Sequence, residues 1–140
     1  MNQQSKFTPA CDENIWSLDP IIEWLFKLGR LEQDQTKFVQ ALSEKILQAG
    51  APIDRLSIML PTLNPLFRGT SATWRKDTNK TIPFLAQHDI ENSDRYIGSP
   101  FQQLLETNRS VRQSLCELPE NAHRAFTELA EDDFTDYYAM

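Results

Sequence analysis

Few residues in this sequence have the types and the spacing that enzymatic chemistry requires. Nucleophilic catalysis needs a serine or cysteine beside a base, and that base is most often a histidine. The chain has two histidines, His88 and His123, and neither lies in a recognisable catalytic motif. No serine has the flanking glycines of a nucleophile elbow, and the four glycines are too scattered for a phosphate-binding loop. The sequence therefore predicts a chain that is not itself an enzyme.

A metal site is not indicated either. Cys11, Cys116 and the two histidines are far apart in the sequence, whereas zinc ligands usually come at short spacings. The densest carboxylate group, Glu131-Asp132-Asp133 with Asp136, lacks the alternating spacing and the turn glycine of a calcium loop. We interpret this group as a solvated helix end and expect no metal. The sequence identifies no cofactor.

The segment from Asn64 to Arg75 has the most unexplained polarity. Its arginines and tryptophan offer guanidinium donors and a stacking face, which would suit an anionic or aromatic ligand. With two residues from a loop expected to face them, the predicted ligand-binding residues are Arg68, Trp74, Arg75, His88 and Tyr96. The simpler interpretation, which stays open, is a strand with a buried tryptophan and solvent-facing arginines.

Composition sets the class of protein. The 140 residues, 40% of them hydrophobic, fit one globular core. A net charge of −6 repels phosphate backbones, so nucleic acid is not an expected partner. No secretory signal and no membrane-spanning stretch is visible, which predicts a cytoplasmic protein with reduced cysteines and no membrane partner. We expect residues 1–14 to be a flexible leader and residues 15–140 to form a single domain.

Hydrophobic periodicity predicts a helical hairpin followed by strands. The first helix begins at Asp19-Pro20 and ends near Gly29, and the second runs over residues 33–49. Strands are expected over residues 55–60 and 66–76, and weaker signals indicate a short strand at 84–86 and a loop at 89–95. Gly69 suggests a bulge or a close backbone approach.

The rest of the chain predicts two more helices and two more strands. Ser99 with Gln102 forms a capping box for one helix, and Asn108 suits its left-handed end. Further elements are expected as a strand over 111–115, a helix from Pro119, and a strand over 135–140 that enters the sheet. Because the sequence ends in an aromatic strand, a sheet position is left for a partner or for further chain.

Two segments resemble a known family. Residues 60–69, Leu-Pro-Thr-Leu-Asn-Pro-Leu-Phe-Arg-Gly, and Thr73-Trp74-Arg75 resemble the N-terminal sensor domain found ahead of bacterial class III adenylate/guanylate cyclase catalytic domains. The resemblance extends over about residues 15–140, through segments 50–55, 99–106 and 135–140. It implies a GAF-like α+β fold, in which a central antiparallel sheet carries the helical hairpin and further helices.

The resemblance also has limits. The family usually continues past the Asp-Tyr-Tyr strand, so we expect either a cut or a naturally short form of the domain. The paired metal-binding aspartates of cyclases have no counterpart here, so cyclase activity does not carry over. What carries over is a regulatory role, with an unassigned ligand.

Two functional hypotheses follow. The first is a sensory module that binds a small ligand or partner and relays the change to a downstream cyclase effector domain. The alternative is an interaction or dimerisation module without a ligand, which would use the first helix and the last strand as contact surfaces. The alternative requires a homodimer or a larger assembly.

Overall fold

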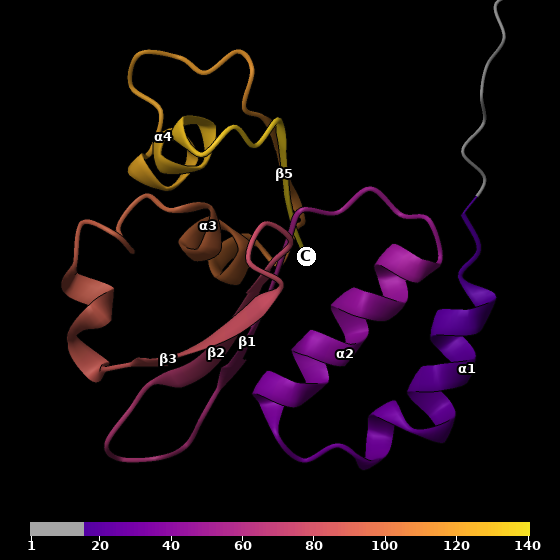
Figure 1. The fold of residues 1–140 in the computed structure, drawn as a ribbon. Helices are drawn as coiled ribbons and strands as arrows, with labels where there is room; N and C mark the ends of the chain where they lie inside the picture. Colours follow the sequence, from indigo (N-terminus) through magenta and orange to yellow (C-terminus); the bar gives the residue numbers. More distant parts are fainter. Residues whose placement is uncertain (1–15) are drawn as a thin grey trace, which may run out of the picture. The chain divides into compact units, whose positions relative to one another are not determined.

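The computed structural model describes residues 16–140, so the leader predicted over residues 1–14 lies outside the described residues. The helices are α1 Asp19–Lys27, η1 Gly29–Leu31, α2 Gln35–Gln48, η2 His88–Asn92, α3 Pro100–Thr107 and α4 Arg124–Glu131. The strands are β1 Arg55–Pro61, β2 Gly69–Arg75, β3 Lys80–Ala86, β4 Val111–Ser114 and β5 Asp136–Ala139 (Figure 1). The described chain forms two compact units: unit 1 contains residues 16–56 and 74–81, and unit 2 contains residues 57–73 and 82–140.

The described residues confirm the predicted α+β class. They form four α-helices and two antiparallel sheets, one in the order β1-β2-β3 and one of β4 with β5. The expectation that the last strand enters one central sheet was wrong, because β5 pairs with β4 alone among the described strands. This ribbon has its own apolar cover: the ring of Tyr137 packs edge-on against Phe126 of α4, with the centroids 5.3 Å apart.

The predicted helical hairpin is confirmed in unit 1. α1 has a proline in its first turn, and α2 is capped by Asp34, whose carboxylate accepts the Lys37 N–H at 3.0 Å. The rings of Trp24 and Phe38 stack between the two helices, with a centroid distance of 5.8 Å. Gly29 lies under this tryptophan, and a Cβ there would approach the indole ring to 3.0 Å. α1 ends at Lys27 with Leu28 as its C-cap, before the predicted end near Gly29, which instead begins η1. The glycine makes room for the hairpin's aromatic contact.

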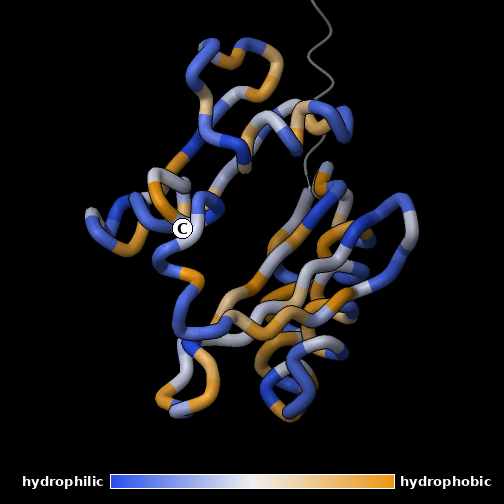
Figure 2. Tube along the Cα trace, turned by 90° about the vertical axis from the view of Figure 1, so that its left-hand side faces the viewer, coloured by the Kyte–Doolittle hydropathy of each residue, from blue (hydrophilic) through white to orange (hydrophobic). Residues whose placement is uncertain are grey.

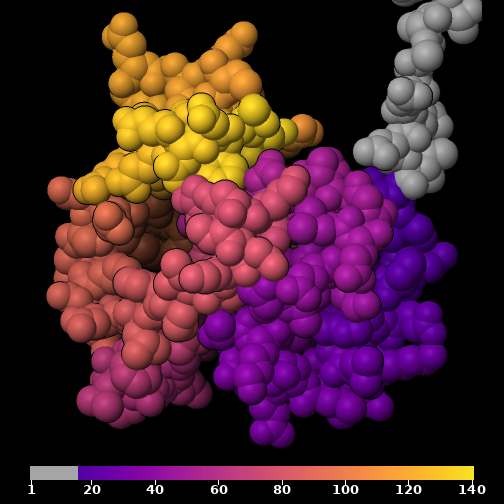
Figure 3. Space-filling model, viewed as in Figure 1, coloured from indigo at the N-terminus to yellow at the C-terminus, as the bar shows by residue number. Residues whose placement is uncertain are grey.

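The opposite side of α2 packs on the tip of the β2–β3 hairpin. Val39 is fully buried, and Gln40 donates to Asn79 Oδ1 at 3.1 Å and accepts from the Thr81 hydroxyl at 2.7 Å. Unit 1 is thus layered, with α2 between α1 and the hairpin tip. One side of α1 is not covered by the other described residues of unit 1, since Ile22 and Phe26 are exposed. The indigo atoms of this segment lie at the surface in the space-filling view (Figure 3).

Two features of the strands in unit 2 follow from glycine and proline. Gly69 begins β2, and a Cβ there would lie 2.9 Å from the carbonyl oxygen of Leu60, which confirms the predicted close backbone approach. β3 runs through Pro83 and is longer than the predicted strand at 84–86. Proline is tolerated because β3 is an edge strand of its sheet.

The predicted caps of α3 are confirmed, whereas the predicted start of α4 is wrong. Ser99 Oγ accepts the Gln102 N–H at 3.1 Å, and Asn108 ends α3 in the left-handed conformation. The returning side-chain bond of the capping box goes to the N–H of Gly98. α4 begins at Arg124 rather than at Pro119, because the His123 side chain supplies its cap.

Along the trace, short hydrophobic segments (orange) and short hydrophilic segments (blue) follow each other closely (Figure 2).

Within residues 16–140, no helix combines the length and the apolar character needed to span a bilayer.

Candidate functional site

The five predicted ligand-binding residues are divided between the two units. Trp74 and Arg75 belong to unit 1, whereas Arg68, His88 and Tyr96 belong to unit 2. Each group has its own local partners, and these partners decide what the side chains can do.

Trp74 is a core residue of unit 1. Its side chain is fully buried, and its indole N–H donates to Asn79 Oδ1 at 3.1 Å. Arg75 lies at the surface of the same strand, where its Nη2 contacts Asp77 Oδ2 at 3.0 Å. The hydrogen bond from this guanidinium lowers the pKa of the Asp77 carboxyl. The buried tryptophan of the simpler sequence interpretation is therefore confirmed.

Arg68 and His88 both connect the loop of residues 62–68 to η2. The Nε of Arg68 contacts Glu91 Oε1 at 2.7 Å, and its backbone N–H donates to the carbonyl of Ala86. The Nε2 of His88 lies 3.3 Å from the carbonyl oxygen of Asn64. The structure therefore brings these two predicted residues to one loop junction. An anion that binds Arg68 must compete with Glu91 for the guanidinium.

Tyr96 lies near the start of α3, where its ring packs edge-on against Phe101 with a centroid distance of 6.1 Å. Within residues 16–140, no group of three or more His, Cys, Asp or Glu side chains is placed to hold a metal ion.

A surface that the ligand-site prediction did not include lies on α1 and on Leu18, the N-cap residue that precedes it in helical conformation. Leu18, Ile22 and Phe26 follow each other at four-residue intervals, and their exposed fractions are 54%, 44% and 72%. Residues four apart lie on one helix face, so the three side chains form a continuous apolar stripe. We call these three residues the α1 stripe. Its signal was the four-residue spacing, but the sequence does not say which helix face a neighbour covers.

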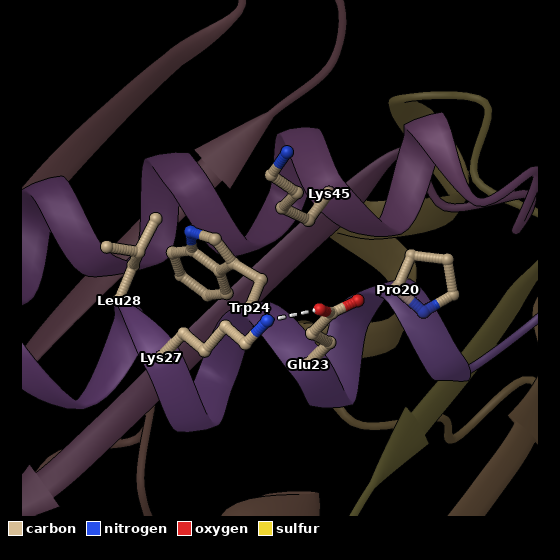
Figure 4. A pocket seen from close by; sticks show the side chains of 6 residues that line it. All are labelled: Pro20, Glu23, Trp24, Lys27, Leu28 and Lys45. Carbon is tan, nitrogen blue, oxygen red and sulfur yellow. Dashed lines mark hydrogen bonds and ion pairs between the residues drawn. The ribbon is translucent and has the colours of Figure 1, made fainter.

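A shallow hollow of about 310 Å³ lies on another flank of α1 (Figure 4). Its lining residues are Pro20, Glu23, Trp24, Lys27, Leu28 and Lys45. Glu23 and Lys27 form an ion pair at 2.5 Å across one turn of the helix. The indole ring and the leucine give the hollow an apolar floor, and the charged side chains surround it. Such an open depression suits a side chain of a docking protein better than an enclosed small molecule.

Comparison of the chain with models of protein families, with curated proteins and with solved structures gives no match.

Proposed function

We propose that this chain is a non-catalytic regulatory module of cyclic-nucleotide signalling, which relays a signal to an effector domain through protein contacts. The resemblance of residues 60–69 and 73–75 to the sensor domain of class III cyclases supports the signalling context. The α1 stripe supports relay by contact.

The single observation that carries the proposal is that α1 is apolar on two faces. Ile21 is 5% exposed and Trp24 stacks on Phe38, so one face holds the hairpin together. The α1 stripe lies beside this face and is exposed. A contiguous exposed apolar patch on a charged protein is typical of a protein–protein contact. A partner that binds the stripe touches the same helix that positions Trp24 against α2, and it would relay a signal if it bound two packings of the hairpin with different affinity.

The reading frame beyond the Met140 codon provides the first test. The proposal expects a class III cyclase catalytic domain there. If that domain is present, the rate at which the continuous polypeptide converts ATP to cyclic AMP measures whether a signal reaches the catalytic domain. A frame that encodes an unrelated enzyme contradicts the cyclase assignment.

A matched pair of variants then tests the surface. Leu18→Glu places a charge on the α1 stripe, and Leu105→Glu places one on α3 at nearly the same exposure, 56% against 54%. We expect the first variant to change the cyclase rate and the second to leave it unchanged. Thermal melts of both variants show whether each still folds. Equal rates for the two folded variants contradict the proposal.

A second candidate is a sensor of a small anionic ligand, favoured by the meeting of Arg68 and His88 at one loop junction. Native mass spectrometry of freshly purified protein tests it. This candidate expects a retained mass that Arg68→Ala loses while its melting temperature stays the same. Retention that is unchanged in the folded variant contradicts it.

A further inference from the structure

We infer that the α1 stripe binds the α1 stripe of a second copy of this chain, with the two helices antiparallel. The inference rests on the proposed function, because it names the partner of the same surface. It is argued from the position of the charges beside the stripe.

The charges of α1 form a second row parallel to the stripe. Asp19, Glu23 and Lys27 are each one residue beyond a member of the stripe, and so lie about 100° further around the helix. When the stripe faces a partner, this row lies at the rim of the contact. The row is acidic at the start of the helix and basic at its end.

This order of charges is self-complementary in one orientation only. A two-fold axis that passes near Ile22 and runs perpendicular to both helices makes the helices antiparallel. It places Leu18 of each copy near Phe26 of the other, and Asp19 of each copy near Lys27 of the other. In a parallel two-fold pair, the two charge rows lie on opposite sides of the contact, so Asp19 and Lys27 gain no pairing across it. The helix dipoles also favour the antiparallel pair, because opposite ends then adjoin.

The negative charge of Glu23, in the middle of the row, is balanced by an ion pair within each copy. Glu23 meets its own counterpart near the axis, but Lys27 of the same helix lies 2.5 Å from its carboxylate. Opposite charges at a rim mainly set orientation, whereas like charges suppress a wrong arrangement. The row therefore selects the antiparallel orientation, and the apolar stripe provides the contact area.

The size of the surface sets the expected strength. α1 has nine residues and is thus about 14 Å long, which is short for an interface that must bury about 800 Å² on each side. We therefore expect a weak, reversible dimer. Its formation is visible as a concentration-dependent sedimentation coefficient between about 1 μM and about 1 mM protein, the range of weak dissociation constants.

The first test is sedimentation velocity of the full chain with one matched pair of variants. Ile22→Glu places two carboxylates at the axis, and we expect dimer affinity to fall more than about tenfold. Leu105→Glu adds the same charge on α3 and should leave the dimer intact. A wild-type chain that stays monomeric up to the highest concentration overturns the inference, as does a dimer that Ile22→Glu leaves unchanged.

The second test addresses orientation. Asp19→Lys and Lys27→Asp should each weaken self-association, since each puts like charges together at both ends of an antiparallel pair. An equimolar mixture of the two variants should restore dimers, because the lysine introduced in one variant then meets the aspartate introduced in the other. Loss of helix stability alone predicts no such rescue. A parallel pair predicts no loss in the single variants, because the two charge rows then lie on opposite sides of the contact. Either result overturns the antiparallel assignment.

These outcomes separate the dimer from the relay. A monomeric wild-type chain in which Leu18→Glu still alters cyclase output means that the stripe binds another protein. The inference is then wrong and the proposed function stands. If Ile22→Glu disrupts a dimer but Leu18→Glu leaves the cyclase output unchanged, the inference stands and the proposed function is wrong.

Discussion

The indole N–H of Trp74 donates to the side-chain oxygen of Asn79 at 3.1 Å, and this bond closes the tip of the β2–β3 hairpin. The same oxygen accepts from Gln40 of α2 at 3.1 Å. Asn79 has a φ of 48°, in the left-handed region that asparagine tolerates better than most residues. Asn79 therefore forms the turn, accepts a hydrogen bond from the fully buried Trp74 and accepts another from α2.

Asn79→Ala should destabilise the protein by about 2 to 4 kcal/mol, because it leaves a buried donor unpaired and strains a left-handed residue. Asn79→Gly should reduce the free energy of unfolding by less, because glycine adopts the left-handed turn although it offers no side-chain acceptor. Asn79→Asp, which keeps both properties, is the matched control. Urea denaturation monitored by tryptophan fluorescence measures all three. In a Trp74→Phe background the cost of Asn79→Gly should fall, and an unchanged cost would show that the bond does not matter.

Local signals in the sequence were enough to predict the elements that local bonds define. The ends of α3 are an example, because Ser99, Gln102 and Asn108 act within one turn of the residues that they cap. The start of α4 was misplaced because histidine is not a usual capping residue, so Pro119 seemed the better start. The pairing of β5 depends on residues 111–114, and no local pattern encodes that partner.

The same limit applies to the candidate site. The sequence alone does not decide whether Trp74 lines a pocket or belongs to the core. Its bond to Asn79 and its full burial in unit 1 identify it as a core residue. The four-residue spacing of Leu18, Ile22 and Phe26 is visible in the sequence. Their exposure is not, because it depends on which face of α1 the second helix covers.

Gly69→Ala should destabilise the protein by about 1 to 3 kcal/mol. The new Cβ would lie 2.9 Å from the backbone oxygen of Leu60, and backbone cannot rotate away as a flexible side chain can. Thermal melting followed by circular dichroism measures the loss. Thr70→Ala, at the next position of the same strand, serves as control and should cost clearly less. Equal losses at the two positions would mean that the close approach is not the cause.

The ion pair between Arg112 and Asp136 joins β4 to β5, with Nη2 and Oδ2 2.8 Å apart. The hydrogen bond from the guanidinium lowers the pKa of Asp136 below its ordinary value of 3.8. A carboxyl with a lowered pKa stabilises the fold fully at pH values above 3.8, and this contribution disappears as the pH falls through the lowered value.

Arg112→Gln should therefore move the pKa of Asp136 back toward 3.8. Carboxyl carbon chemical shifts, recorded by NMR during an acid titration, report the group directly. The stability difference between wild type and variant should be present at neutral pH and absent once the carboxyl is protonated in both. Since both side chains are exposed, we expect only a small difference. The same pKa for Asp136 in the two proteins would contradict the assignment of the pair.

His123 caps α4 and ties it to the chain before α3. Its Nδ1 accepts the N–H of Ala125 at 3.0 Å, and its Nε2 lies 3.1 Å from the carbonyl oxygen of Ile97. A neutral ring with its hydrogen on Nε2 satisfies both bonds, so the geometry assigns that tautomer.

His123→Ala should cost about 1 kcal/mol through the lost cap, and it should also release the link to Ile97. His123→Asn is the matched control, because asparagine is a strong capping residue but is too short to replace the second ring nitrogen. Amide hydrogen exchange separates the two roles. Exchange at Ala125 should quicken in the alanine variant and stay slow in the asparagine variant, whereas both variants should lose the same contact to Ile97. Slow exchange at Ala125 in the alanine variant would show that the ring does not cap the helix, and the start of α4 would then need another cause.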